Sequence, residues 1–334
     1  MAEYKGIKGF KVQYLSADPS DPIIGQTWYN STSKDLKYTG VTTVGSWATG
    51  NNMNTARSSL AGAGTQTAGL AFGGSPPPPV TGATEEYGGT SWATSAGSLN
   101  TARDFLSGAG TQTAALAFGG STTGAGTDTV GATEEYDGNS WATSPGSLNT
   151  ARFRMGGAGI QTAALAFGGS SSTLPSGTGS TEEYDGNSWA TSPGSMNTAR
   201  RTFAGCGTQT AALGFGGTVP GPAVTGATEE YNGATWASSN PLNTARNELA
   251  GAGIQTAGLA FGGYTTVEIS ATEEYDGTSW TTSPASLATA RTLLAGCGTQ
   301  IAGLAFGGNA GPHLAATEEW TGPGSGLTKT ITVS

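Results

Sequence analysis

The residues of this sequence that could act together chemically are arginines and glutamates that recur at fixed intervals. Six arginines lie about 45–49 residues apart, and a Glu-Glu pair follows each of them after about 27–31 residues. A guanidinium binds carboxylate, sulfate or phosphate groups through paired hydrogen bonds, so a collar of arginines would form an anion site. The candidate ligand-binding residues are Arg57, Arg103, Arg152, Arg200, Arg246 and Arg291.

The same spacing also fits a structural role for the arginines. One glutamate of each pair, for example Glu134 or Glu135, would begin a strand on the face where the arginine lies. An ion pair between the two would then join neighbouring loops. The sixfold repetition favours this alternative, because a catalytic constellation has no reason to occur six times.

Few other side chains are available for catalysis or metal binding. His313 is the only histidine, so a Ser-His-Asp site or a histidine-rich metal centre has little to build on, and we expect this residue to be exposed. Paired glutamates serve in glycosidases, but pairs at six equivalent strand starts indicate scaffold. We therefore expect no enzyme, no catalytic residue, no metal and no cofactor, with a carbohydrate-active enzyme as a remaining alternative.

The two cysteines, Cys206 and Cys297, occupy the same place in the repeat. Both lie in the sequence AGCGT, where the other four copies have alanine. A thiol that replaces a small buried methyl group is usually inert. We predict two reduced core thiols.

The charge and hydropathy of the chain exclude several classes of partner. The 23 acidic and 14 basic residues give a net charge of −9, whereas nucleic-acid and polybasic membrane contacts need a basic surface. No apolar run reaches the roughly 18–20 residues of a spanning helix, and the N-terminus lacks the apolar core of a signal peptide. We expect no nucleic acid, no membrane insertion and no leader.

The arginines belong to a repeat that covers most of the chain. Each copy contains an FGG triplet and a Thr-Glu-Glu-aromatic motif, and the first five copies then have a Trp. In one copy the expected strands are 152–160, 161–169, 181–186 and 188–191, separated by Gly-Gly and Asp-Gly turn signals. Gly, Ser and Thr interrupt every window long enough for a helix. The pattern predicts an all-β protein of four-stranded units, which is typical of propeller blades.

The order Arg, Gly-Gly, Tyr, Trp at these spacings resembles the kelch repeat over residues 46–320. The resemblance implies a six-bladed kelch-like β-propeller in which the strand that begins at the Arg is innermost and Tyr and Trp pack between blades. The small side chains of 60–65 suit a place beside the axis, where space is least. The chain would divide into an N-terminal arm and β-hairpin, 1–45, and a propeller, 46–334.

Two segments compete to complete the last blade, because residues 291–320 supply only three strands. Residues 46–50 match the fourth-strand pattern and include Trp47, which lies outside the six copies. Residues 327–334 alternate polar and apolar side chains, and they would instead close or flank the ring. We favour the N-terminal strand.

The connections between strands differ in how much they vary. Because strands alternate in direction, the connections from strand four to strand one and from strand two to strand three share a face. The first set is nearly uniform, whereas the second differs in every copy, at 75–82, 121–131, 170–180, 218–226, 264–270 and 309–315. Variation on a rigid scaffold is typical of a recognition surface, although loop tips also tolerate drift.

Residues 1–45 lie outside the repeat and predict a hairpin, with strands at 27–30 and 36–40. This hairpin resembles short segments of bacteriophage tail and fibre proteins, and the Gly/Ser/Thr/Ala-rich copies resemble propellers of marine phages. An isolated hairpin with exposed aromatics is marginal alone, which favours docking over a simple cap on the propeller. The candidate docking residues are Phe10, Tyr14, Trp28 and Tyr29.

These resemblances imply a non-enzymatic virion protein, assembled in the host cytoplasm, that forms part of a phage tail or fibre. Its partners would be other virion proteins, bound through residues 1–45, and a host-surface glycan or protein receptor, bound on the variable face. The alternative is a purely architectural capsid or tail decoration that binds no receptor.

Overall fold

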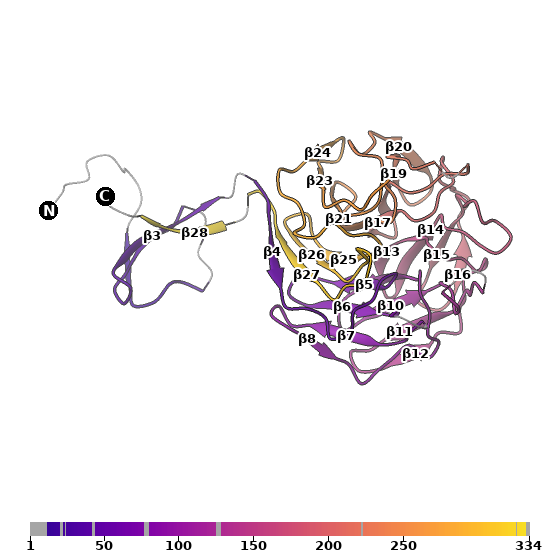
Figure 1. Ribbon diagram of the computed structural model, residues 1–334, viewed down its shortest axis with the longest axis horizontal. Helices are drawn as coiled ribbons and strands as arrows, with labels where there is room; N and C mark the ends of the chain where they lie inside the picture. The colour runs from indigo at the N-terminus through magenta and orange to yellow at the C-terminus, as the bar shows by residue number, and fades with distance from the viewer. Residues whose placement is uncertain are drawn as a thin grey trace. The chain divides into compact units, whose positions relative to one another are not determined.

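The computed structural model describes residues 12–20, 23, 25–41, 44–76, 80–124, 128–221, 223–324 and 326–331. The chain forms two compact units, which we call the repeat unit (Ser46–Thr321) and the terminal unit (Met1–Gly45 with Gly322–Ser334). Within the described ranges every regular element is a strand and none is a helix (Figure 1). Accordingly, no described helix is long and apolar enough to span a membrane.

The strands are three to seven residues long, because Gly, Ser and Thr end each apolar run after a few residues. In the repeat unit, Gly-Gly pairs with positive φ, such as Gly73 and Gly74, follow the second strand of each repeat. In chain order the strands are β1 (Gln13–Leu15), β2 (Thr27–Asn30), β3 (Asp35–Val41), β4 (Ser46–Gly50), β5 (Ala61–Gly64), β6 (Gly69–Phe72), β7 (Thr84–Tyr87), β8 (Trp92–Thr94), β9 (Ser107–Gly110), β10 (Ala115–Phe118), β11 (Thr133–Tyr136), β12 (Trp141–Thr143), β13 (Gly156–Ile160), β14 (Ala163–Phe167), β15 (Thr181–Tyr184), β16 (Trp189–Thr191), β17 (Ala204–Thr208), β18 (Ala211–Phe215), β19 (Thr228–Tyr231), β20 (Trp236–Ser239), β21 (Ala250–Ile254), β22 (Ala257–Phe261), β23 (Thr272–Tyr275), β24 (Trp280–Thr282), β25 (Ala295–Gly298), β26 (Ala302–Phe306), β27 (Thr317–Thr321) and β28 (Gly326–Ile331).

The described strands form seven four-stranded sheets, whereas the sequence led us to expect six. Six of the seven belong to the repeat unit: β5–β8, β9–β12, β13–β16, β17–β20, β21–β24, and β25–β26–β27–β4. The seventh, β1–β2–β3–β28, lies in the terminal unit. The expected count is wrong because the two ends of the chain pair with each other and make a sheet of their own.

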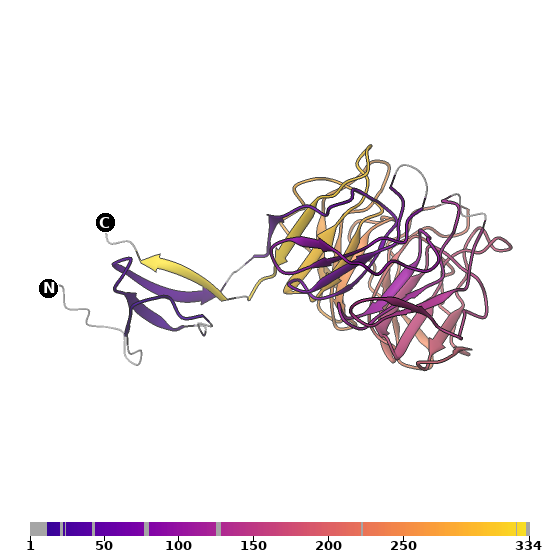
Figure 2. The same ribbon diagram turned by 90° about the horizontal axis from the view of Figure 1, so that it is seen from below.

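The last sheet of the repeat unit is completed by the N-terminal strand, as we favoured. β4 pairs antiparallel with β27, and Trp47 stands opposite Trp320. The competing assignment of 327–334 to the ring is wrong, because β28 pairs antiparallel with β3. Figure 2 shows β28 beside a strand from the beginning of the chain. The expected domain of 46–334 therefore ends at Thr321.

The six sheets of the repeat unit stand around a common centre, in a β-propeller-like arrangement (Figure 1). Each sheet stays open, since strand pairing does not continue from one sheet into the next. The innermost strands instead contact one another in the cyclic order β5, β9, β13, β17, β21, β25 and back to β5. This contact needs glycine: a Cβ on Gly108 would lie 2.5 Å from the ring of Phe72 and 3.1 Å from the carbonyl oxygen of Gly62.

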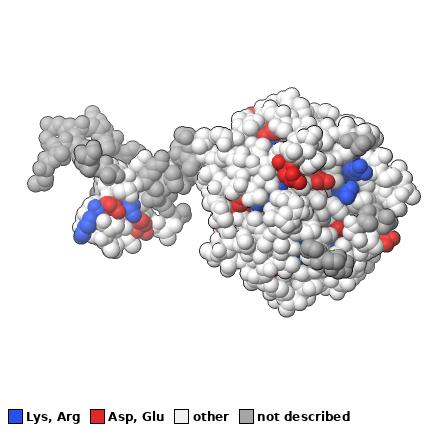
Figure 3. All heavy atoms as spheres, in the orientation of Figure 1, with Lys and Arg blue, Asp and Glu red and all other residues white. Residues whose placement is uncertain are grey.

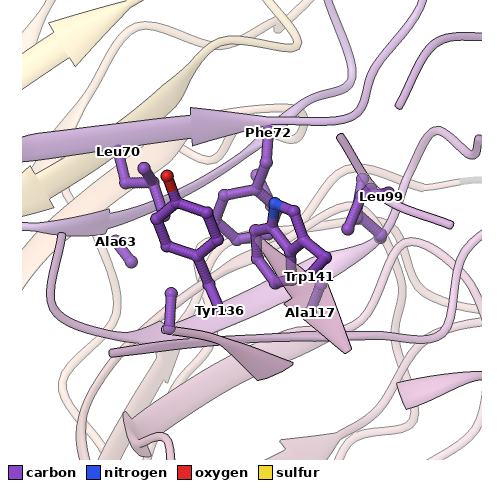
Figure 4. Packing of buried hydrophobic residues seen from close by; sticks show 10 residues of the cluster. Ala63, Leu70, Phe72, Leu99, Ala117, Tyr136 and Trp141 are labelled. Atoms are coloured by element: carbon purple, nitrogen blue, oxygen red, sulfur yellow. The ribbon is translucent and has the colours of Figure 1, made fainter. Parts of the chain in front are cut away.

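The hydrophobic core of the repeat unit lies between neighbouring sheets, and Figure 4 shows one such layer. Phe72 on β6 packs against Trp141 on β12 with ring centroids 4.9 Å apart, and Tyr136 lies 5.0 Å from the same indole. The indole N–H of Trp141 donates to Thr84 Oγ1 at 2.8 Å. Tyr and Trp therefore pack between sheets, as expected. At the last sheet Trp47 makes the equivalent bond, donating to Thr272 Oγ1 at 2.8 Å.

The terminal unit has a small core around Trp28, which is fully buried. The indole N–H donates to Asp18 at 3.0 Å, and the same carboxylate pairs with Lys37 at 2.7 Å. The hydrogen bond from Lys37, followed by those from Trp28 and Asn30, lowers the pKa of Asp18 to about 2. These contacts tie the segment before β2 to the hairpin.

Candidate functional site

The six repeat arginines are fully buried, so they do not form a surface collar for an anion. Their burial lowers the pKa of the guanidinium, for example at Arg152, while the neighbouring carboxylate raises it again. Each guanidinium lies 2.8–3.4 Å from the first glutamate of the Glu-Glu pair in its own sheet. The pairs are Arg57–Glu85, Arg103–Glu134, Arg152–Glu182, Arg200–Glu229, Arg246–Glu273 and Arg291–Glu318.

The paired glutamates also fix the connection that precedes each arginine. In the first repeat, the backbone N–H groups of Asn54 and Thr55 donate to the two oxygens of Glu85, at 2.6 and 3.3 Å. A buried carboxylate satisfied in this way holds both the loop and the guanidinium in place. The geometry therefore supports the structural reading of the arginines and corrects the ligand-binding one.

In five of the six Glu-Glu pairs, the second glutamate links neighbouring sheets. A tyrosine hydroxyl donates to this half-buried carboxylate across the boundary between sheets. Burial, followed by this hydrogen bond, raises the pKa of the phenols in four of these pairs to about 12. The pairs are Tyr87–Glu319, Tyr136–Glu86, Tyr184–Glu135, Tyr231–Glu183 and Tyr275–Glu230.

The variable connections between second and third strands begin close to the centre of the repeat unit. The residue after each repeat arginine forms an antiparallel bridge with the residue after the Gly-Gly pair, as Ser58 does with Ser75 and Asn247 with Tyr264. His313, which lies in the last of these connections, is half-buried rather than exposed. Its Nδ1 lies 3.0 Å from the hydroxyl of Ser58. The last variable loop thus contacts the start of the first repeat.

Six residues that the sequence analysis did not select form a closed ring at this centre, two positions after each repeat arginine. We call them the axial ring. Each backbone N–H donates to the carbonyl oxygen of the ring member in the preceding sheet, at 2.8–3.0 Å, and the first donates to the last. The members are Ser59, Phe105, Arg154, Thr202, Glu248 and Leu293.

The axial ring has an unusual backbone conformation. Every member has a positive φ, between 50° and 57°. Among the described residues, Lys34 is the one other non-glycine residue with a positive φ. This left-handed region normally favours glycine, because a Cβ costs about 1–2 kcal/mol there. Backbone strain of this kind is concentrated at functional sites in proteins.

The axial ring surrounds a cavity of about 90 Å³ at the mouth of the central channel. The residues that follow the ring members line the cavity floor, and they also line a second cavity of about 130 Å³ between the innermost strands. The floor is apolar and consists of Leu60, Leu106, Met155, Phe203, Leu249 and Leu294.

The sequence did contain a signal for the axial ring. After the repeated Ala-Arg, the next two residues read SS, DF, FR, RT, NE and TL, so both positions differ in every copy while the Ala-Arg before them is constant. This short variable stretch was missed because the long loops vary far more.

The polar groups of the axial ring are concentrated around Arg154. Its guanidinium carbon lies 4.3 Å from the ring centroid of Phe105 and 5.2 Å from that of Phe153. Burial lowers the pKa of Arg154, and Glu248 opposes this effect. Figure 3 shows that the face in view carries few charged side chains, with acidic groups near the centre of the repeat unit.

The predicted docking residues have unequal positions in the terminal unit. Phe10 lies outside the described residues. Trp28 is fully buried and is therefore a core residue rather than a docking residue. Tyr14 is 74% exposed and contacts the half-buried Tyr29, with ring centroids 5.3 Å apart. The sequence did not predict that the small sheet buries Trp28, and this burial excludes Trp28 from the set of docking residues.

Both cysteines are free and buried, which confirms the prediction of two core thiols. Burial raises the pKa of Cys206 and Cys297 to about 12, so neither is a ready nucleophile. No cluster of three or more metal-ligating side chains occurs among the residues that the structure describes.

A comparison of the chain with models of protein families finds no match. A comparison with curated protein sequences finds none either. Two features characterise this site, namely a constant buried network and a variable centre.

Proposed function

We propose that this protein is a non-enzymatic virion component of a bacteriophage tail or fibre, which attaches to a glycan or protein on the host surface. In this proposal the six sheets of the repeat unit are the blades of a six-bladed kelch-like propeller. The variable loops and the axial ring form the attachment face. The observation that carries the proposal is that the largest differences between copies are concentrated on this one face.

The constant residues of the repeat support this interpretation because each has a structural partner. The repeat arginines bind glutamates, the tyrosines bind glutamates of the preceding sheet, and the indoles donate to threonines. The variable residues have no such shared role. Variation in a rigid frame is the arrangement expected of a recognition surface.

The terminal unit is proposed to dock onto other virion proteins. Four large apolar or aromatic side chains among its described residues are more than half exposed, namely Val12, Tyr14, Ile23 and Val44. A four-stranded sheet with so few buried residues gains stability from a partner that covers such side chains. Tyr14 and Ile23 are the residues to test.

The adsorption of virions to host cells tests the attachment role. We expect that replacing 264–270 by the sequence of 309–315 reduces adsorption. The swap removes the variable loop of the fifth repeat and puts a second copy of the loop of the sixth repeat in its place. The control is Asn139→Ser, in an exposed turn between third and fourth strands on the opposite face. Unchanged adsorption after swaps of all six variable loops would overturn attachment and favour the architectural alternative.

The incorporation of the protein into particles tests the docking role separately. We expect Tyr14→Ala combined with Ile23→Asp to lower the amount of protein per particle, while the purified variant keeps its thermal unfolding midpoint. Lys34→Ala, in the turn after β2, is the control on the same unit. Normal incorporation of the double variant would exclude this surface as the docking site.

A further inference from the structure

The cavity inside the axial ring is the strongest unassigned site of the molecule. Its volume of about 90 Å³ has room for about three water molecules, or for one substituent of a larger ligand. Five of its six ring members are half-buried, and Ser59 is 7% exposed. The cavity therefore has room for one edge of a ligand, and the remainder of the ligand would contact the variable loops.

The six ring members divide the mouth into a polar side and a less polar side. Because the ring follows chain order, Arg154, Thr202 and Glu248 are consecutive around it. Leu293, Ser59 and Phe105 complete the circle. A ligand that fits both sides has hydroxyl groups along one edge and C–H groups along the other.

The polar side contains hydrogen-bonding groups that the protein itself leaves unused. The Nε of Arg154 is buried and has no hydrogen-bond partner in the described structure. On the same side, Oε2 of Glu248 accepts from the hydroxyl of Thr292, and its Oε1 has no hydrogen-bond partner among the described residues. One unused donor group and one unused acceptor match hydroxyl groups, which both donate and accept.

The charges at the mouth argue against an ionic ligand. Besides burial, the charges of Glu248, Arg201 and Asp104 influence the pKa of Arg154. Among the described residues, no ion pair within 4 Å joins it to either carboxylate, because the ion pairs of the repeat unit are those of the six repeat arginines. The cavity itself is lined by one guanidinium, that of Arg154, and one carboxylate, that of Glu248, which offset one another, so neither an anion nor a cation gains a net attraction.

We propose that the mouth of the channel binds the hydroxyl-bearing edge of a neutral saccharide, with Arg154, Thr202 and Glu248 as the residues that hydrogen-bond to it. This proposal deepens the proposed function and rests on it, since the saccharide would be part of the host surface. The strained backbone of the axial ring has a role in this arrangement. It places six different residues around one small cavity, where glycine would supply no side chain.

The test is a titration of the purified full chain with two sets of oligosaccharides, followed by nuclear magnetic resonance or calorimetry. One set contains neutral hexoses and N-acetylhexosamines, and the other contains their sialylated counterparts. We expect binding to members of the neutral set. Arg154→Gln should weaken it about tenfold, the change expected for loss of one strong hydrogen bond. Thr202→Val should weaken it less, because the Thr202 hydroxyl already donates to the carbonyl oxygen of Arg201 at 2.7 Å and can only accept from the ligand.

The matched control is Leu293→Met, at the same ring position on the less polar side, which should change the affinity less than about twofold. Thermal unfolding identifies variants that fail to fold. If Arg154→Gln fails to fold, Thr202→Val takes its place as the test variant. The saccharide affinity of Glu248→Gln is a third measurement, because this variant keeps the size of the side chain and removes its charge.

The outcomes separate this inference from the proposed function. Binding that the loop swaps abolish and the ring variants leave intact would overturn the inference and leave attachment standing. Preference for the sialylated set, or host adsorption without any saccharide binding, would also overturn the inference and leave attachment standing. Saccharide binding weakened by the ring variants, together with normal adsorption of virions that carry them, would support the site and overturn its role in attachment.

Discussion

Arg152 and Arg154 are two residues apart, and their surroundings are opposite. Arg152 is fully buried, pairs with Glu182 at 2.8 Å and has an equivalent in every repeat. Arg154 is half-buried, makes no ion pair within the described residues and has a different residue at its position in every other repeat. The same residue type thus serves architecture at one position and remains available for recognition at the other.

This contrast teaches that repetition and variation within one chain carry different information. A side chain that recurs six times contacts something that also recurs six times, namely the neighbouring sheet. A side chain that differs six times faces a place with no sixfold partner, which in this fold is the axis. The following predictions test whether the two positions differ as the structure indicates.

The largest effect is expected from Arg152→Met. Removal of the guanidinium leaves Glu182 as a buried carboxylate without its partner, which costs about 3–5 kcal/mol of unfolding free energy. Arg154→Met should cost less than about 1 kcal/mol, because no buried charge loses a direct ion pair. Denaturant unfolding of both variants measures the difference, and equal losses would remove the distinction between the two positions.

A smaller loss is expected at the constant contacts between sheets. Tyr184→Phe removes the hydrogen bond of 2.6 Å to Glu135 and should lower the unfolding free energy by about 1–2 kcal/mol. Thr191→Ala, on an exposed part of β16, is the control in the same sheet. An unchanged midpoint for Tyr184→Phe would show that the phenol contributes packing alone.

The same tyrosines predict a loss of stability at high pH. The pKa of Tyr184 is raised by burial and by Glu135 to about 12, from about 10 in an unfolded chain. The folded state therefore favours the protonated phenol, and this contribution is complete below pH 10 and lost as the pH rises toward 12. Unfolding midpoints measured across this window should fall less steeply for Tyr184→Phe than for the unchanged protein.

In the axial ring, Ser59→Gly should stabilise the protein by about 0.5–1 kcal/mol, because glycine adopts a positive φ without strain. Ser58→Gly is the matched control, since Ser58 lacks a positive φ and contacts His313. The control should lose stability. A loss at both positions would show that the ring conformation carries little strain.

The smallest effect is expected at the boundary where the pattern of tyrosines is broken. Trp320 stands in the position of the sixth tyrosine, and burial raises the pKa of Glu274. Glu274→Gln should therefore stabilise the protein by less than about 1 kcal/mol at neutral pH. The gain should disappear in acid, where Glu274 itself becomes protonated. A loss of stability at neutral pH would contradict this account.

The sequence predicted the repeated part of the fold because each strand has a strong local signal. Gly-Gly, Asp-Gly and the aromatic positions define the strands of the repeat, and SWATG identifies β4 as a displaced fourth strand. The partner of β28 was missed because an alternating strand carries no information about which edge it pairs with.

The candidate site was predicted less well. The repeat arginines attracted attention through their charge, yet burial and pairing remove them from the surface. The docking aromatics included Trp28 because a hairpin considered alone has no inside, and a fourth strand supplies one. The axial ring depends on six residues far apart in the sequence that meet only when the sheets close on one another.

The pairing of β4 with β27 has a mechanical consequence. The chain enters the repeat unit at Ser46 and leaves it at Thr321, and these two residues are opposite each other in the same sheet. A load between the two units is therefore shared by two peptide connections. Neither end of the repeat unit is free, so a pull cannot peel the sheets away one after another from a loose terminus.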